Sequence, residues 1–285
     1  MVPTSALAVK RTGLTLTWYL IVFIGMIVTL FPVVWGFISS FRPNPIIFRY
    51  ISPLSLMTFS PTPFSLEAYF EIFNKGFGRA LFNTFFVTAS TVGLGLVVNS
   101  MGGIVFAKMR FPGKNLIFMV TVFAYLVPFQ AIAIPLFILI RSLGWMNSYQ
   151  ALIIPATLNG VVILLFRQFF MAIPDDYVDS AKIDGARWRT IYWRLFLPMS
   201  GPALISAGLI LFLDIWLAFL WPLIANPSRE YAIVQVAIAR LTSEYGVFWN
   251  EQFAAATITA VIPVIILMSL QKYYIRAVTG SEIKG

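Results

Sequence analysis

The residues of this 285-residue chain that could carry chemistry are few, and the most unusual is an acid within a hydrophobic run. Asp214 is the only carboxylate well inside any of the long apolar segments. A charged side chain at membrane depth is costly, so it marks a functional position by default. An intramembrane protease would need a second acid, or a serine with a base, and no such pair is visible. We therefore expect no catalytic residue and place Asp214 in a substrate pathway.

Neutral polar and aromatic side chains at the depth or edge of the membrane are further candidates. Together with Asp214 they form the predicted substrate pathway: Asn83, Gln130, Asn159 and Trp216. For each amide, a hydrogen bond between helices is the alternative role, and both roles stay open.

Composition excludes several kinds of site. The chain has no Cys and no His, which excludes disulfides, thiol nucleophiles, Cys/His metal sites and histidine bases. It also lacks a phosphate-binding G-x-x-x-x-G-K-[ST] loop, since Gly113-Lys114-Asn115 has no upstream glycine. We expect no cofactor and no metal in this chain. Active transport would therefore draw its energy from an ion gradient or from another subunit.

The overall composition is that of an integral membrane protein. Hydrophobic residues make up 59% of the chain and charged residues 11%, with a mean hydropathy of +0.86. Soluble domains are about half apolar and about a quarter charged. The net charge of +9 comes from bases scattered singly among apolar runs, which favours a role in membrane topology over nucleic-acid binding.

Six apolar runs are long enough to cross a membrane as helices. They cover residues 16–41, 80–107, 115–140, 149–170, 199–221 and 253–274. The sequence thus predicts an all-α membrane protein in which residues 1–285 form a single transmembrane domain. Glycines in the second run offer small faces for close helix packing, at positions 93, 95, 102 and 103. The excursion at 222–252 is predicted to carry a surface helix near 231–241.

Orientation follows from the distribution of Lys and Arg among the loops. If residues 1–15 are cytoplasmic, thirteen of the twenty basic residues lie on the cytoplasmic side and seven on the outer side. Both termini and the polar stretch at 174–198 are then predicted to be cytoplasmic.

That polar stretch, residues 174–198, is the only segment dense in both signs of charge, and we call it the polar module. A helix is expected to begin at Pro174 and to break at Asp184-Gly185. Beyond the break, apolar residues recur at helical spacing and define one face: Trp188, Ile191, Tyr192 and Leu195. The polar module is therefore predicted to be a helix-turn-helix between the fourth and fifth spans.

The polar module resembles a known motif. Asp179-Ser180-Ala181, three residues, Gly185, nine residues and then Leu195-Phe196-Leu197-Pro198 are similar to the EAA motif of binding-protein-dependent ABC importers. This chain has Asp179 in place of Glu and Ser180 in place of Ala. The resemblance implies a coupling helix that docks on an ATP-binding subunit. The residues it assigns to coupling are Asp179, Ser180, Ala181, Ile183, Asp184, Gly185, Ala186, Leu195 and Pro198.

The resemblance extends over most of the chain, to permeases of carbohydrate importers of the maltose-permease type. Segments that carry it include 106–114, Trp221-Pro222-Leu223 and Ile283-Lys284-Gly285. Where relatives often have Trp-Asn-Glu-Phe, this chain has Trp216-Leu217-Ala218-Phe219, so the solute is not carried over from a relative. The implied fold is the type I ABC importer permease fold.

The resemblance also implies partners and a place in the cell. The expected partners are two ATP-binding cassette subunits that hold Mg-ATP, a second homologous permease chain, an extracytoplasmic solute-binding protein and membrane lipid, without nucleic acid. The excursions at 42–79 and 222–252 are the expected docking surfaces for the binding protein. The expected location is the inner membrane of a prokaryote. Two other readings stay open: a gradient-driven carrier that uses Asp214, and a membrane scaffold without transport activity.

Overall fold

The chain is described by a computed structural model that covers the backbone at residues 4–51, 55–243 and 246–279, and side chains at 17–51, 55–242 and 247–270. Two compact units make up the chain. Unit 1 comprises Met1–Lys75 and Leu241–Ile258, and unit 2 comprises Gly76–Arg240 and Thr259–Gly285. The first residues of the predicted cytoplasmic N-terminus and Ile283-Lys284-Gly285 lie outside the described residues.

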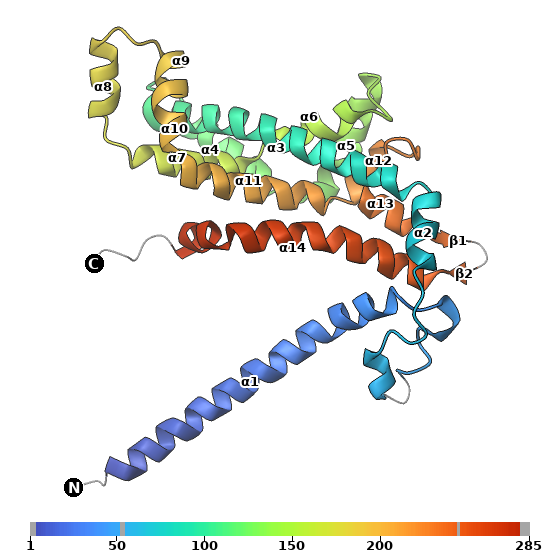
Figure 1. The fold of residues 1–285 in the computed structure, drawn as a ribbon. Helices are drawn as coiled ribbons and strands as arrows, with labels where there is room; N and C mark the ends of the chain where they lie inside the picture. The colour runs from blue at the N-terminus through green and yellow to red at the C-terminus, as the bar shows by residue number, and fades with distance from the viewer. Residues whose placement is uncertain (1–3, 52–54, 244–245, 280–285) are drawn as a thin grey trace. The chain divides into compact units, whose positions relative to one another are not determined.

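Unit 1 contains the first long helix and the segments that follow it (Figure 1). Its elements are α1 (Thr4–Ser39), the short 3-10 helices η1 (Asn44–Ile46) and η2 (Leu56–Phe59), α2 (Glu67–Asn74), β1 (Thr242–Ser243), β2 (Gly246–Val247) and the beginning of α14 (Trp249–Thr279). The two strands pair antiparallel and add a two-residue ladder to a fold predicted to be all-α.

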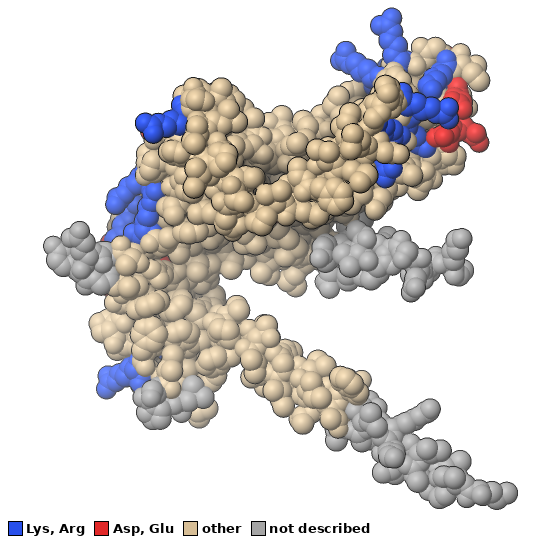
Figure 2. Space-filling view, turned by 180° about the vertical axis from the view of Figure 1, so that it is seen from behind, with Lys and Arg blue, Asp and Glu red and all other residues tan. Residues whose placement is uncertain are grey.

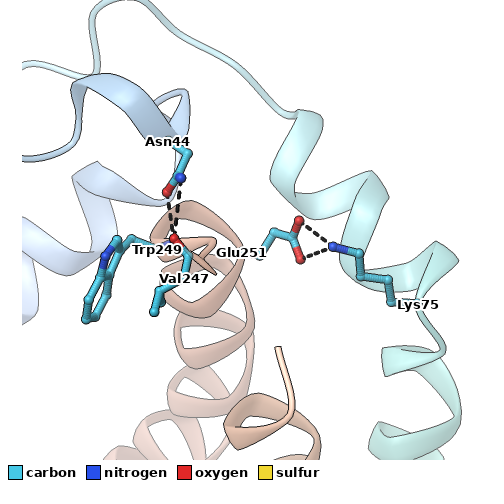
Figure 3. A network of polar contacts seen from close by, with 5 residues as sticks. All are labelled: Asn44, Lys75, Val247, Trp249 and Glu251. Carbon is cyan, nitrogen blue, oxygen red and sulfur yellow. Dashed lines mark hydrogen bonds and ion pairs between the residues drawn. The ribbon is translucent and has the colours of Figure 1, made fainter. Parts of the chain in front are cut away.

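Polar contacts tie the segments of unit 1 together (Figure 3). Lys75 Nζ lies 2.6 Å from both carboxylate oxygens of Glu251, which is almost fully buried. The amide of Asn44 accepts from Trp249 N at 2.8 Å and donates to Val247 O at 3.4 Å. These bonds join residues about two hundred positions apart along the chain, so the excursion after α1 is held to β2 and to the first turn of α14.

Unit 2 consists of helices in the described residues (Figure 1). They are α3 (Phe77–Lys108), α4 (Lys114–Tyr125), α5 (Phe129–Ser142), α6 (Tyr149–Thr157), α7 (Gly160–Met171), α8 (Asp176–Ile183), α9 (Trp188–Ile191), the π-helical η3 (Tyr192–Phe196), α10 (Leu197–Met199), α11 (Gly201–Trp216), α12 (Leu220–Ala225) and α13 (Val234–Ala239).

The predicted spans differ in their continuity. By length and apolarity, Thr17–Ser39, Phe77–Lys108 and Trp249–Leu270 can each cross a membrane as one helix. The predicted spans 115–140 and 149–170 are bent pairs, with bends of 100° between α4 and α5 and 41° between α6 and α7, and α11 in the predicted span 199–221 forms a third bent pair, at 84°, with the preceding stretch Trp188–Met199. The described residues therefore hold three straight candidate spans, and up to six if each bent pair is one span.

Helix α3 is the packing centre of unit 2, and it lies against α6, α7 and α11. Gly103 makes the close approach to α7 possible, because a Cβ at this position would meet Phe166 Cβ and would lie 3.1 Å from Arg167 N. Gly95 has the same role toward α11, where a Cβ would lie 2.8 Å from Leu211. At Gly93 a Cβ would meet nothing within 4 Å. Small faces thus matter at two of the four glycines singled out above and not at Gly93.

The predicted surface helix near 231–241 is wrong in its placement. Helix α13 has Val234 and Val236 fully buried, and Val234 N donates to Thr84 Oγ1 at 2.9 Å. The amide of Asn83 donates to the carbonyls of Glu230 and Ala232 at 2.8 and 2.9 Å. Because its valines complete the core beside α3, this part of the 222–252 excursion is an integral layer of unit 2.

Candidate functional site

Unit 2 encloses a cavity of about 1090 Å³ beside α11. Its walls come from α3, the bent pair α4–α5, α6, α11 and α12, and most of its lining is apolar. Four polar side chains line it, namely Thr84, Thr88, Tyr125 and Asp214. None of its lining residues is Lys or Arg. We call this hollow the central cavity.

The breaks in the apolar spans position the polar groups of the central cavity. Tyr125 is the last residue of α4, directly before the 100° bend. Its hydroxyl interacts with the carboxyl of Asp214 on α11, and it accepts a hydrogen bond from Asn159 Nδ2 at 2.8 Å. Thr88 is almost completely buried, and its Oγ1 has no hydrogen-bond partner among the described residues. The cavity therefore offers a carboxylate, a phenol and an unpartnered hydroxyl.

Asn159 supports these polar groups through hydrogen bonds from outside the cavity lining. It caps α7, because its Oδ1 accepts from Val161 N and Val162 N at 3.1 Å each. Its backbone N–H donates to Asn99 Oδ1 at 2.9 Å, and Asn99 in turn donates to Thr157 O at 2.8 Å. Asn159 therefore fixes the break between α6 and α7 and orients Tyr125, and its side chain does not line the cavity.

Three other predicted pathway residues also lie outside the cavity lining. Asn83 is fully buried and anchors the segment before α13. Trp216 is fully buried, with its ring against Phe85 and Phe212 and its Nε1 donating to Thr259 O at 3.2 Å. Gln130 is exposed on α5. Of the predicted set, the structure places only Asp214 on the cavity wall.

Sequence reasoning missed Tyr125 and Thr88. Tyr125 lies three residues before Pro128, and a proline in an apolar run can end a helix and free polar groups there. That signal could have drawn attention to Tyr125. For Thr88 there was no local signal, since a threonine in a transmembrane helix commonly bonds to its own backbone, as Thr84 does with Ala80 O at 2.7 Å.

The polar module forms the second part of the site. Figure 2 shows that Lys, Arg and acidic side chains gather at the end of unit 2 that carries α8 and α9. Gly185 has φ +77°, and its N–H donates to Lys182 O while Ala186 N–H donates to Ala181 O, both at 2.9 Å. This pair of bonds is the Schellman motif, which needs a left-handed residue after the helix. The break predicted at Asp184-Gly185 is therefore present.

The two helices of the polar module have distinct inner and outer faces. Ile191 and Tyr192 are buried, and Trp188 and Leu195 pack against the same core, as the spacing predicts. Ile183 lies on the outer face and is 86% exposed. Of the other predicted coupling residues, Asp179, Ser180, Asp184, Gly185 and Pro198 are exposed, while Ala181, Ala186 and Leu195 are half-buried.

Lys108 ties the polar module to the end of α3. Its Nζ donates to Asp175 Oδ1 and to Ile173 O, both at 2.5 Å. The bond and the charge of Lys108 lower the pKa of the Asp175 carboxyl. The predicted helix start at Pro174 is displaced to Asp176, with Asp175 as the N-cap whose carbonyl accepts from the N–H groups of Val178 and Asp179. A second tie is the buried contact between Ser100 Oγ and Tyr192 Oη at 2.7 Å.

Known proteins resemble the chain over nearly its whole length. The arabinooligosaccharides transport system permease protein AraQ of Bacillus subtilis is 30% identical over 98% of this chain and 97% of its own length. AraQ of Halalkalibacterium halodurans is 29% identical over 97% and 99% of the two chains. The sn-glycerol-3-phosphate transport system permease protein UgpE of Yersinia enterocolitica is 28% identical over 96% and 99%.

Solved structures show the same fold. A bacterial ABC transporter involved in the import of the acidic polysaccharide alginate superposes with a TM-score of 0.79 at 22% identity, over 93% of this chain and 97% of that one.

Residues 99–280 match the family described as "Binding-protein-dependent transport system inner membrane component". That match covers more than half of the chain and includes the polar module and Asp214. The chain therefore belongs to the family of binding-protein-dependent transport system inner membrane components.

Proposed function

We propose that this chain forms one side of the pathway through which an ATP-driven importer moves a neutral, hydroxyl-rich solute of the oligosaccharide class. The observation that carries the proposal is the chemistry of the central cavity. Its polar wall consists of a carboxylate, a phenol and threonine hydroxyls. Such groups accept and donate hydrogen bonds to sugar hydroxyls.

The charge of the central cavity favours a neutral solute over an anionic one. Asp214 is its single charged lining residue, and a carboxylate repels a phosphate or a uronate in a low-dielectric site. Phe129, Phe219 and Trp221 line the same cavity and offer rings on which the apolar face of a sugar can stack. The relatives named for arabinooligosaccharides fit this chemistry better than those named for sn-glycerol-3-phosphate.

The energy is supplied through the polar module. We place the polar module and both termini in the cytoplasm, because most of the Lys and Arg residues then lie on the cytoplasmic side. Exposed Ile183 and the Schellman turn at Gly185 form an apolar tip suited to a groove on an ATP-binding subunit, which binds Mg-ATP. The ties through Lys108 and Tyr192 transmit movement of the tip to α3. ATP, the binding protein and solute then bias one two-state switch.

The remaining partners complete the importer. One chain provides half of a pathway, so a second homologous permease chain faces the central cavity. A solute-binding protein docks on the outer side, at 42–79 and at the exposed parts of 222–252.

The test is uptake by the complete importer in proteoliposomes, with a labelled arabino-oligosaccharide and with sn-glycerol 3-phosphate. Asp214→Ala removes a charged acceptor, whose hydrogen bond is worth about 1.5–3 kcal/mol, so we expect oligosaccharide uptake to fall by roughly tenfold or more. Gln130→Ala, outside the cavity lining, is the matched control and should transport normally.

Three results would overturn the proposal. The first is unchanged uptake by Asp214→Ala, and the second is preferential uptake of the phosphate ester by the unaltered importer. The third is gradient-driven transport by the purified chain without ATP, which would make Asp214 an ion site of a secondary carrier.

A further inference from the structure

A second hollow of unit 2 lies apart from the central cavity, where α3 ends, α4 begins and α7 ends. It has a volume of about 490 Å³. Three cationic side chains line it, namely Arg110, Lys114 and Arg167, and no lining residue is acidic. We call it the basic pocket. Neither the central cavity nor the polar module includes these three residues.

Two of the three cationic groups, those of Lys114 and Arg167, are held by backbone carbonyls, and Arg167 also lies 4.3 Å from the centroid of the Phe118 ring. Lys114 Nζ donates to Met109 O at 3.0 Å and to Ala107 O at 3.3 Å. Arg167 Nε donates to Phe106 O at 3.3 Å. These contacts are with neutral groups, so they orient the side chains and leave their charge uncompensated.

Lys114 also lies close enough to the other two charges to be repelled by them. Both Arg167 and Arg110 act on Lys114 with unfavourable Coulombic interactions. The nearby carboxylate of Asp175 is already bound to Lys108 at 2.5 Å. Among the described residues, no carboxylate forms an ion pair with the three cations of the basic pocket. A bound anion would relieve this repulsion, which makes the basic pocket a site for an anion.

The surroundings of the basic pocket indicate which anion fits. Leu116 and Met171 line the pocket and are 66% and 54% exposed, and Val120, one turn beyond Leu116, is 59% exposed. Leu116 and Val120 continue from the pocket along α4, a helix of a candidate membrane span, and Met171 ends α7 beside it. A ligand with a negative head and apolar chains matches both parts. Helix ends in a membrane protein lie at the level of the lipid headgroups.

We propose that the basic pocket binds the phosphate of an anionic lipid headgroup. Arginine guanidinium groups match phosphate oxygens with paired hydrogen bonds, and lysine adds a point charge. Basic pockets between transmembrane helices are suited to anionic headgroups. The lipid chains lie over Leu116 and Val120. This site is independent of the solute carried through the central cavity.

The test compares lipids that share their acyl chains and differ in headgroup. The assembled importer is purified, freed of lipid and titrated with phosphatidylglycerol or phosphatidylcholine, and bound lipid is counted by native mass spectrometry. We expect phosphatidylglycerol to bind more tightly. Arg110→Gln and Arg167→Gln should each weaken its binding roughly fivefold and leave phosphatidylcholine binding unchanged.

The controls separate the proposal from two alternatives. Arg141→Gln changes an exposed basic residue near the end of α5, and it should bind lipid as the unaltered importer does. Arg110 is exposed, so its variant is informative even if Arg167→Gln fails to fold. Equal binding of the two lipids, or equal losses with Arg141→Gln, would overturn the proposal. Displacement of phosphatidylglycerol by millimolar inorganic phosphate would also overturn it and identify a free phosphate as the ligand.

Discussion

Replacing Gly185 with alanine is expected to loosen the end of α8 by a backbone effect alone. At φ +77° the residue is in the left-handed region, which costs an L-residue with a Cβ about 1–2 kcal/mol. A Cβ built at Gly185 meets nothing within 4 Å, so no steric clash adds to this cost. Alanine also restricts the unfolded chain, which returns about 0.4–1 kcal/mol. The net destabilisation is then ~1 kcal/mol, or about fivefold in the ratio of closed to frayed helix ends.

Hydrogen exchange in the assembled importer measures this ratio directly. The two amides that close the Schellman motif belong to residues 185 and 186. In Gly185→Ala they are expected to exchange about fivefold faster, by the estimate above. Solute-stimulated ATP hydrolysis should fall with them, because Ile183 is then presented less often in its docking position. Gly185→Asn is the matched control, since asparagine tolerates the left-handed region, and it should lie closer to the unaltered protein.

The reasoning would be refuted by a folded Gly185→Ala importer whose amide at residue 186 exchanges as slowly as before. Faster exchange with full ATPase stimulation would instead support the structural role of the Schellman motif and contradict its role in coupling.

Two further predictions concern the packing and the charge of unit 2. Gly103→Ala should lower the melting temperature, because a Cβ there meets α7 and overpacking costs about 1–3 kcal/mol. The control Gly93→Ala, with open space around it, should melt at or above the temperature of the unaltered protein. Equal melting temperatures of the two variants would contradict this prediction. The pKa of Asp175 is lowered by Lys108, so the ion pair stabilises the fold above the unfolded pKa of about 4 and loses this effect as the pH falls through the lower, folded pKa. Lys108→Met should therefore be less stable than the unaltered chain at neutral pH, with a difference in melting temperature that shrinks in acid.

The polar module could be predicted from the sequence because its signals are local. The spacing of Trp188, Ile191, Tyr192 and Leu195 identified the buried face, and glycine at 185 identified the turn. Both depend on residues within a few positions of one another. The family resemblance likewise followed from a short stretch of sequence, the spacing of Asp179-Ser180-Ala181, Gly185 and Leu195 to Pro198.

The central cavity could not be predicted in the same way. Its walls depend on bends at residues 126–128 and 158–159, and these lie inside runs that remain apolar throughout. Hydropathy measures apolarity and not helix continuity, so residues 115–140 and 149–170 were each predicted as one span. Asp214 interacts with Tyr125, which lies 89 positions earlier in the chain. Likewise, Trp216 is buried by Phe85 and Phe212, and no local pattern announces that pairing.

Two contacts join α3 to the polar module, Lys108 with Asp175 and Ser100 with Tyr192, and they limit whether the polar module can be exchanged for that of a relative. A chimera that takes residues 174–198 from a relative would bring its own partners for Ser100 and Lys108. If the incoming segment lacks an acid at 175, Lys108 loses its ion pair, and if it lacks a hydroxyl at 192, Ser100 loses its bond to the polar module. If the polar module docks on the ATPase as proposed, an importer engineered to use a different ATPase would need the polar module and these two positions on α3 transplanted together.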